Sequence, residues 1–285
     1  MPTQGSPISS NLAEKSRSSL RSRVISAAVL APIVLLAVYF GGVAFFLMIA
    51  IAVLLMAYEW CRLTCSEAWG WDMLLMAITG LCAISLVQFP VLVADRPVGP
   101  LAAAFAIIGI GMIAAFIRGV WMRQDLLWRL SGVPYVTVGA VALVWLRQFE
   151  PAGLMLVLWV LVIVWSMDIG AYFFGRAIGG PRLAPRVSPN KTWAGMIGGM
   201  LCAGLCGGAL GFAANFGAAG QLILMSGLIG GWSQLGDLAE SAVKRYFGVK
   251  DMSNLIPGHG GILDRVDGLL FGAPAILLLA VILFE

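Results

Sequence analysis

The sequence predicts an all-α, polytopic integral membrane protein with about nine transmembrane helices. Of its 285 residues, 60% are hydrophobic and 11% are charged, whereas a soluble domain is about half apolar and about a quarter charged. The mean hydropathy is +0.95, and apolar runs of about 20 residues, the length that crosses a bilayer as a helix, recur along the chain. Lipid offers the backbone no hydrogen-bond partners, so these runs are expected to be helical.

The elements follow in order from a polar, Ser-rich tail at residues 1–23, which is expected to be flexible. The apolar run after the tail is longer than a signal-peptide core and lacks a clear cleavage site, so we interpret it as an uncleaved first span. The fifth predicted span is short, and the eighth begins apolar and ends amphipathic. The predicted spans are residues 24–40, 42–58, 72–94, 99–117, 132–147, 152–174, 193–213, 221–240 and 266–284.

Lys and Arg are unevenly distributed over the predicted loops. Sixteen of the 18 lie on the side of the tail and of the two long polar loops, 175–192 and 244–265, and two, Arg96 and Arg147, lie on the other. Because cytoplasmic loops are enriched in Lys and Arg, the tail and both polar loops are predicted to be cytoplasmic and the C-terminus to lie across the membrane. The strong bias, with no clear organelle targeting signal, favours the inner (plasma) membrane of a bacterium.

The eighth predicted span carries a polar stripe. Asp237, Glu240, Ser241 and Lys244 lie at i, i+3, i+4 and i+7, a spacing that places them on one helix face, and mostly Leu, Ala and Val lie between them. Such a stripe on a membrane helix is expected to face a bundle interior or a water-filled cavity. For Lys244 and Arg245 the alternative is a solvated face where the helix leaves the membrane.

The loop at residues 250–261 places the single histidine, His259, among glycines and a proline. Glycine allows close approach to a ligand, and backbone N–H groups in such a loop can bind phosphate. Asp264 and Asp267 then begin the last span at i, i+3, with Arg265 beside them. The alternative for these carboxylates is stabilisation of the helix dipole.

Carboxylates on two neighbouring helices predict a site for a hard cation, because Mg²⁺ is held by one or two carboxylates together with waters and substrate phosphates. Nearby basic side chains suit phosphate oxygens: these are Lys244, Arg245, Lys250 and Arg265. At a cytoplasmic membrane face the combination indicates phosphoryl or nucleotidyl transfer to a lipid. Residues 151–285 are therefore predicted to be the catalytic helices with their cytoplasmic loops, and residues 24–150 to be N-terminal transmembrane helices.

The earlier polar loop adds an anion site. Ser188, Asn190 and Thr192 directly precede the span at 193–213, where side-chain caps and free N–H groups bind anions. The alternative is that the basic residues of the loop only anchor it at the membrane surface. Asp168, inside the sixth span, is either a further metal or network carboxylate or an internal partner for an arginine. Glycines four residues apart in 195–231 predict close packing of the seventh and eighth spans.

Three segments carry a resemblance to a known family: SAVKRYFGVKDMSNLIPGHGGILDRVD at 241–267, SPNKTWAG at 188–195 and DIGAYFFGR at 168–176. The first resembles the signature of the phosphatidate cytidylyltransferases, also called CDP-diacylglycerol synthases. The motifs cover about the C-terminal 120 residues. The resemblance implies an all-helical, membrane-embedded homodimer that condenses CTP with phosphatidic acid in the lipid membrane, giving CDP-diacylglycerol and pyrophosphate. It further implies Mg²⁺, with K⁺ as a second ion, and no nucleic-acid partner.

The family's metal-binding aspartates correspond to Asp237, Asp264 and Asp267, and its catalytic basic pair to Lys244 and Arg245. The remaining polar and glycine positions of the motifs are implied to contact substrate: Ser188, Asn190, Lys191, Thr192, Ser241, Lys250, Asp251, His259, Gly260, Gly261 and Arg265.

The chain departs from the family pattern at two positions. Ala194 stands where Glu is usual, and Gly268 stands where Ser is frequent.

Two other functions remain open from the residues alone. A CTP-dependent lipid-alcohol kinase, or an archaeal-type lipid cytidylyltransferase, could use the same kind of site with another acceptor. Intramembrane Asp168, Asp237 and Asp267 could instead line the pathway of an ion-coupled transporter. The sequence has no G-x-x-x-x-G-K-[ST], no G-x-G-x-x-G after a strand and no H-E-x-x-H. P-loop, dinucleotide-binding and zinc-protease chemistry are therefore disfavoured.

Overall fold

The structure is a computed structural model, and it describes residues 26, 28–65, 68–90, 99–123, 125–256 and 260–284. The predicted flexible tail and His259 lie outside these residues. Within them the chain is almost entirely helical, which confirms the predicted fold class. The helices are Ala28–Phe40, α2 (Gly42–Thr64), α3 (Trp71–Gln88), α4 (Gly99–Trp121), α5 (Leu126–Gln148), α6 (Gly153–Ile178), α7 (Trp193–Ala213), α8 (Ala219–Tyr246) and α9 (Leu263–Phe284).

Seven of the described helices are long and apolar enough to cross a membrane, so the predicted number of about nine spans is approximate. The other two are Ala28–Phe40, which is shorter, and α8, whose second half carries the polar stripe. The fifth predicted span is longer than expected. Asp125 caps α5 by accepting a hydrogen bond from the Leu127 N–H, and the helix continues through Pro134 to Gln148.

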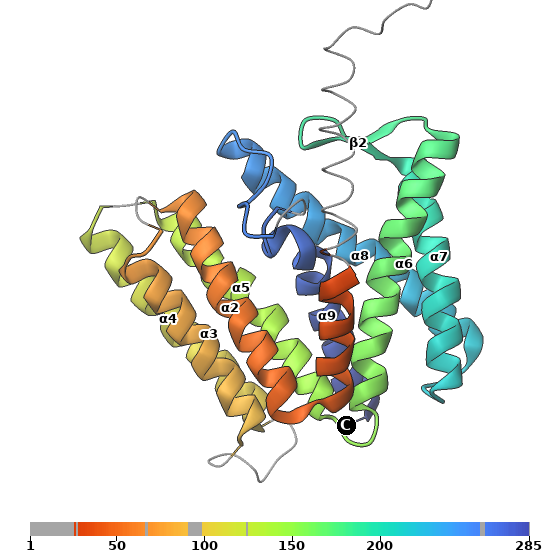
Figure 1. Cartoon of the computed structure of the whole chain (residues 1–285), viewed down its shortest axis with the longest axis horizontal. Coiled ribbons are helices and arrows are strands. Elements are labelled where there is room, and N and C mark those ends of the chain that lie inside the picture. The colour runs from red at the N-terminus through yellow and green to blue at the C-terminus, as the bar shows by residue number, and fades with distance from the viewer. Residues whose placement is uncertain are drawn as a thin grey trace, which may run out of the picture.

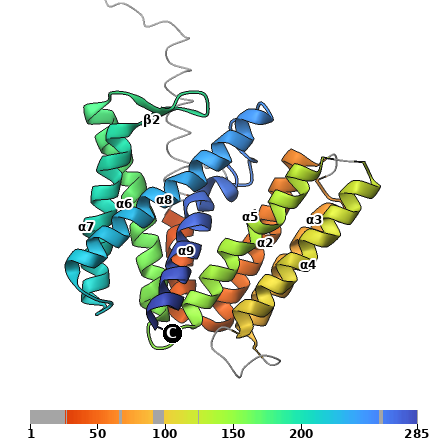
Figure 2. The same ribbon diagram turned by 180° about the vertical axis from the view of Figure 1, so that it is seen from behind.

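The helices form two groups with α9 between them. In Figure 1, α2 to α5 form one group and α6 with α7 the other. Figure 2 shows α8 crossing α9 obliquely between these groups. The segment between α6 and α7 and the segment between α8 and α9 lie at one end of the molecule, and the C-terminus lies at the opposite end. The two polar loops predicted to share one side therefore do lie at the same end.

Close contacts between glycines hold α7 against its neighbours. A Cβ atom added to Gly204 of α7 would lie 2.9 Å from the carbonyl oxygen of Ile223, and one added to Gly227 of α8 would lie 3.1 Å from that of Met200. Backbones approach this closely only where side chains are absent. The close packing predicted for the seventh and eighth spans is confirmed.

A β-hairpin that the sequence did not predict follows α6. Strand β1 (Arg182–Ala184) pairs antiparallel with β2 (Ser188–Thr192), with Arg182 opposite Thr192 and Ala184 opposite Ser188. Thr192 ends β2 and caps α7, because its hydroxyl accepts a hydrogen bond from the Gly195 N–H at 3.1 Å. The hairpin thus joins two membrane helices and holds the polar residues of the SPNKT segment beside them.

Charged residues also tie the ends of the N-terminal helices together. Asp72 at the start of α3 pairs with Arg118 of α4 at 2.9 Å and with Arg129 of α5. The indole N–H of Trp60 in α2 donates to the carbonyl oxygen of Trp128 at 2.9 Å. These contacts lie at the same end as the hairpin, and they fix the end of α2 from which Glu59 reaches the last loop, as described below.

Candidate active site

The site forms where α8 crosses α9. A Cβ on Gly236 would collide with the backbone carbonyl of Asp267, so glycine at this position lets the two helices touch. On the other side of the crossing, a Cβ on Gly268 would lie 2.9 Å from Cγ1 of Val164 in α6. Glycine at 268, the position where the family pattern led us to expect serine, therefore fits a crossing in which α6, α8 and α9 meet without room for a further side chain.

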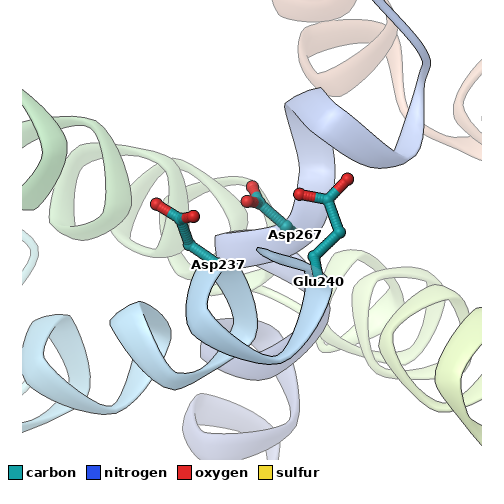
Figure 3. Close-up of side chains that lie close together, drawn as sticks. All are labelled: Asp237, Glu240 and Asp267. Atoms are coloured by element: carbon teal, nitrogen blue, oxygen red, sulfur yellow. The ribbon is translucent and has the colours of Figure 1, made fainter. Parts of the chain in front are cut away.

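Three carboxylates meet at this crossing. Asp237 and Glu240 of α8 and Asp267 of α9 each offer an oxygen within 4.8 Å of the others, and Figure 3 shows the three gathered at the crossing. Oε1 of Glu240 is buried and has no hydrogen-bond partner in the described part of the chain. A buried carboxylate oxygen without a donor is costly, and a cation at the centre of the three carboxylates would satisfy it.

Lys244 extends the polar stripe toward α9. Its ammonium group donates to Oε2 of Glu240 at 2.9 Å and to Oδ1 of Asp264 at 2.7 Å. Ser241 donates to Asp237 at 3.3 Å. The stripe therefore faces the bundle interior, as predicted, and Glu240 is buried. The alternative of a solvated face is wrong for Lys244, whose side chain is 12% exposed.

Asp264 is surrounded by protein donors. Besides Lys244 on Oδ1, its Oδ2 accepts the N–H groups of Met252 at 2.9 Å and Gly261 at 2.8 Å. The carboxylate thus ties the loop before α9 to the start of that helix. It lies outside the group formed by Asp237, Glu240 and Asp267. Metal binding by Asp264 stays a prediction, whereas Glu240 completes the group of three.

A cleft of about 560 Å³ opens beside Asp237. Residues from α6, the hairpin, α7 and α8 line it. Lys191 of β2 reaches into it and contacts Oδ2 of Asp237 at 2.5 Å and Oε1 of Gln234 at 2.8 Å. The Gln234 amide in turn donates to Asp168 at 2.8 Å. Asp168 therefore belongs to a polar network with Gln234 and Lys191, one of the two roles expected for it.

The structure separates the other predicted substrate-binding residues into two sets. Asn190, Lys191 and Thr192 line the cleft, together with Arg176 and Arg182.

The second set consists of predicted site residues that do not line the cleft. Arg245, which was predicted to be catalytic, also lies outside the lining. It is exposed and donates to the carbonyl oxygens of Val187 and Val249 at 3.4 and 3.2 Å, so it links α8 to the hairpin. The predicted substrate-binding residues outside the lining are the half-buried Ser188, Ser241 and Gly260, the buried Gly261, and the exposed Lys250, Asp251 and Arg265.

Three residues of the site were not assigned from the sequence. Glu240 was placed in the stripe but not among the ligands, and Gln234 was not singled out. Glu59 was missed because the second span was predicted to end at residue 58, which made this glutamate a boundary residue at the membrane surface. The helix instead continues to Thr64 and buries Glu59 completely. The available signal in the sequence was that Trp60 and Cys61 follow Glu59 before the next charged residue, Arg62.

Comparison with known proteins agrees with the motifs. Residues 21–283 match the model of the cytidylyltransferase family. A phosphatidate cytidylyltransferase from Brucella suis is 41% identical over 291 residues, covering 94% of this chain and 96% of the relative. One from Pseudomonas aeruginosa is 40% identical over 262 residues, covering 90% and 94%, and one from Haemophilus influenzae is 47% identical over 127 residues, covering 43% and 44%. The chain therefore belongs to the cytidylyltransferase family.

Proposed function

We propose that this protein is a phosphatidate cytidylyltransferase, which joins CTP to phosphatidic acid and produces CDP-diacylglycerol and pyrophosphate. The observation that carries the proposal is the group of three carboxylates at the α8–α9 crossing, beside a basic cleft at the end of a membrane helix bundle. Relatives that match more than nine tenths of their length bear this name. The cleft volume lies within the range of about 300–1,000 Å³ usual for small-molecule sites.

The residues present fit a divalent cation. Asp237, Glu240 and Asp267 supply oxygen ligands, which Mg²⁺ prefers, and Oε1 of Glu240 lacks another partner among the described residues. We propose that these three hold Mg²⁺, with Asp264 as a neighbouring carboxylate held by Lys244. The ion would supply positive charge to the phosphate oxygens at the moment of transfer. Among the described residues the geometry suggests no position for K⁺, which stays an expectation from the family resemblance.

The basic residues of the cleft suit the triphosphate of CTP. Arg176, Arg182 and Lys191 lie in its lining, where Arg can bind phosphate in a bidentate manner and Lys acts as a point charge. Lys191 contacts Asp237, so it lies between the cleft and the carboxylates. We propose that the triphosphate binds along this edge with its α-phosphorus nearest Asp237.

The reaction then needs little proton transfer. An oxygen of the phosphatidate phosphate attacks the α-phosphorus of CTP, the bond from that phosphorus to the oxygen bridging to the β-phosphorus breaks, and pyrophosphate leaves. A phosphate monoester has a second pKa of about 6, so it is mostly dianionic at pH 7 and needs no strong general base. The main task of the protein is to bring two anions together, which the cations of the cleft favour by offsetting their repulsion.

We propose that the hairpin end of the molecule faces the cytoplasm. The positive-inside bias of the loops and the position of the site at this end both support the orientation. CTP would then reach the cleft from the cytoplasm, and phosphatidic acid from the inner membrane. The C-terminus would lie across the membrane, and the family resemblance adds a homodimer as the assembly.

The test is release of pyrophosphate by the purified protein given CTP, Mg²⁺ and vesicles containing phosphatidic acid. Asp267→Asn keeps the side-chain size and removes one charge from the carboxylate group, and we expect loss of release of at least about 100-fold. Asp125→Asn is the matched control, because asparagine caps a helix as well as aspartate and residue 125 lies at the exposed start of α5.

Four outcomes would overturn the proposal. A well-folded wild-type protein that releases no pyrophosphate is not this enzyme. Release supported equally by a lipid alcohol would indicate a different acceptor, and release of CDP in place of pyrophosphate would indicate a kinase. Ion flux in liposomes without nucleotide turnover would favour a transporter.

A further inference from the structure

A buried glutamate of the N-terminal half holds the loop that precedes α9. Glu59 of α2 is fully buried, and its side-chain hydrogen bonds to the described residues run to positions about 200 residues later. Its Oε1 accepts from the Ser253 hydroxyl at 2.5 Å and from the Ile262 N–H at 2.8 Å. Its Oε2 accepts from the Leu263 N–H at 2.8 Å. Both ends of the loop are therefore attached to one carboxylate.

These contacts make Glu59 an N-terminal cap supplied by another helix. The first N–H groups of a helix have no partner within it, and α9 begins at Leu263 after Ile262, whose apolar side chain cannot accept a hydrogen bond. Glu59 accepts the N–H of Leu263, the first residue of the helix, and that of Ile262, the residue directly before it. A carboxylate at this position is also favoured by the helix dipole. The start of α9, and with it Asp264 and Asp267, is thus placed by α2.

The two glycines that end the His-Gly-Gly motif make room for carboxylates of the protein itself. A Cβ on Gly261 would lie 2.5 Å from Oε1 and 2.7 Å from Oε2 of Glu59. Gly260 has φ +84°, and a Cβ there would lie 2.9 Å from Oδ2 of Asp264. Gly261 has no such backbone restriction, so contact with Glu59 is the reason that the structure offers for glycine at 261.

We propose that Glu59 is a positioning residue for the active site: it holds Ser253, Ile262 and the start of α9 so that Asp264 and Asp267 meet Lys244 and Glu240. Gly261 serves the same contact by leaving space for the Glu59 carboxylate, and its role does not depend on touching substrate. The activity readout of this inference rests on the proposed function, whereas the readouts of loop attachment and thermal stability do not.

The first experiment measures hydrogen exchange in the full-length protein for peptides that contain Ile262 and Leu263. Glu59→Gln keeps the size of the side chain but replaces one acceptor oxygen with an NH₂ donor. The glutamine side chain therefore cannot accept the N–H groups of both Ile262 and Leu263 as the carboxylate does. We expect exchange to rise at least about 10-fold in these peptides and to stay unchanged in α3 and α4. Glu150→Gln, in the exposed turn after α5, is the matched control and should change neither exchange nor activity.

Activity per folded protein separates positioning from mere folding. If Glu59 positions the carboxylates, Glu59→Gln lowers kcat about 10- to 100-fold with a small change in KM for CTP, because a misplacement of about 1 Å costs about that much. If Glu59 only supports folding, the folded fraction falls and the activity of that fraction is normal.

The second experiment is a double-mutant cycle between Gly261 and Glu59. Gly261→Ala is expected to lower both activity and thermal stability, because its methyl group meets the carboxylate. In the Glu59→Asp background the carboxylate is one methylene shorter, so adding Gly261→Ala should have a smaller effect than in the wild type. Gly220→Ala, where a Cβ meets nothing within 4 Å, is the matched control.

Each result decides a different point. Unchanged exchange at Ile262 and Leu263 in Glu59→Gln, or equal penalties for Gly261→Ala in both backgrounds, overturns the inference. Loss of protection with full activity per folded protein overturns the positioning role. If the wild type releases no pyrophosphate but Glu59→Gln frees the loop and the two positions are coupled in thermal stability, the proposed enzyme activity fails and the attachment of the loop stands.

Discussion

Replacing Lys244 with methionine should destabilise the protein through the two carboxylates that it neutralises. The ammonium group lies 2.9 Å from Glu240 and 2.7 Å from Asp264, and the side chains of these acids are 1% and 5% exposed. Methionine keeps most of the side-chain volume and removes the charge. The variant therefore leaves two buried carboxylates without their shared cation.

The expected loss can be worked from these contacts. Each charge-assisted hydrogen bond contributes about 1.5–3 kcal/mol, and removing one side of a buried ion pair costs about 3–5 kcal/mol. Asp264 keeps its bonds to the Met252 and Gly261 N–H groups, which favours the lower end of this range. A loss of about 3 kcal/mol would lower the unfolding midpoint by about 6–12 °C for a protein of this size.

The assay is thermal unfolding in detergent, followed by loss of monodisperse protein, with pyrophosphate release measured in parallel. Lys250→Met is the stability control, because Lys250 is exposed and such changes stay within about 0.5 kcal/mol. The double variant Lys244→Met/Glu240→Gln removes one of the uncompensated charges and should be more stable than the single variant. A Lys244→Met protein that unfolds at the wild-type temperature, or a double variant no more stable than the single one, would refute the reasoning.

Three further outcomes are expected. Glu240→Gln should raise the Mg²⁺ concentration for half-maximal activity at least about 10-fold, since one proposed ligand loses its charge; an unchanged titration would exclude Glu240 as a ligand. Gln234→Leu removes one of the two contacts that hold Lys191 in the cleft, leaving the one to Asp237, and should raise KM for CTP about 10-fold with little change in the unfolding midpoint, which steady-state kinetics would check. Gly204→Val places a side chain against the Ile223 carbonyl and should cost about 1–3 kcal/mol in thermal unfolding; wild-type stability would mean that α7 and α8 are not closely packed there.

Features that depend on residues close together in the sequence could be predicted from it. The length and apolar character of each run set the helical membrane fold, because a bilayer accepts a span of fixed length with satisfied backbone groups. The spacing of Glu240 and Lys244 on one helix predicted a shared face, and the two form an ion pair. The capping position of Thr192 was also predictable, because its bond to Gly195 spans only three residues.

The arrangement of the site depended on contacts between distant segments, and these had no local pattern. Helices α8 and α9 cross at Gly236. This crossing brings Asp264 to Lys244 and brings Asp267 to Asp237 and Glu240.

Glu59 shows the same limit most clearly. By itself the sequence determined that this protein is a membrane helix bundle with carboxylates and cations near one face. Only the tertiary structure decided that a glutamate of α2 caps α9, some 200 residues away, because burying that charge is stable only where backbone N–H groups of another helix are already placed to receive it.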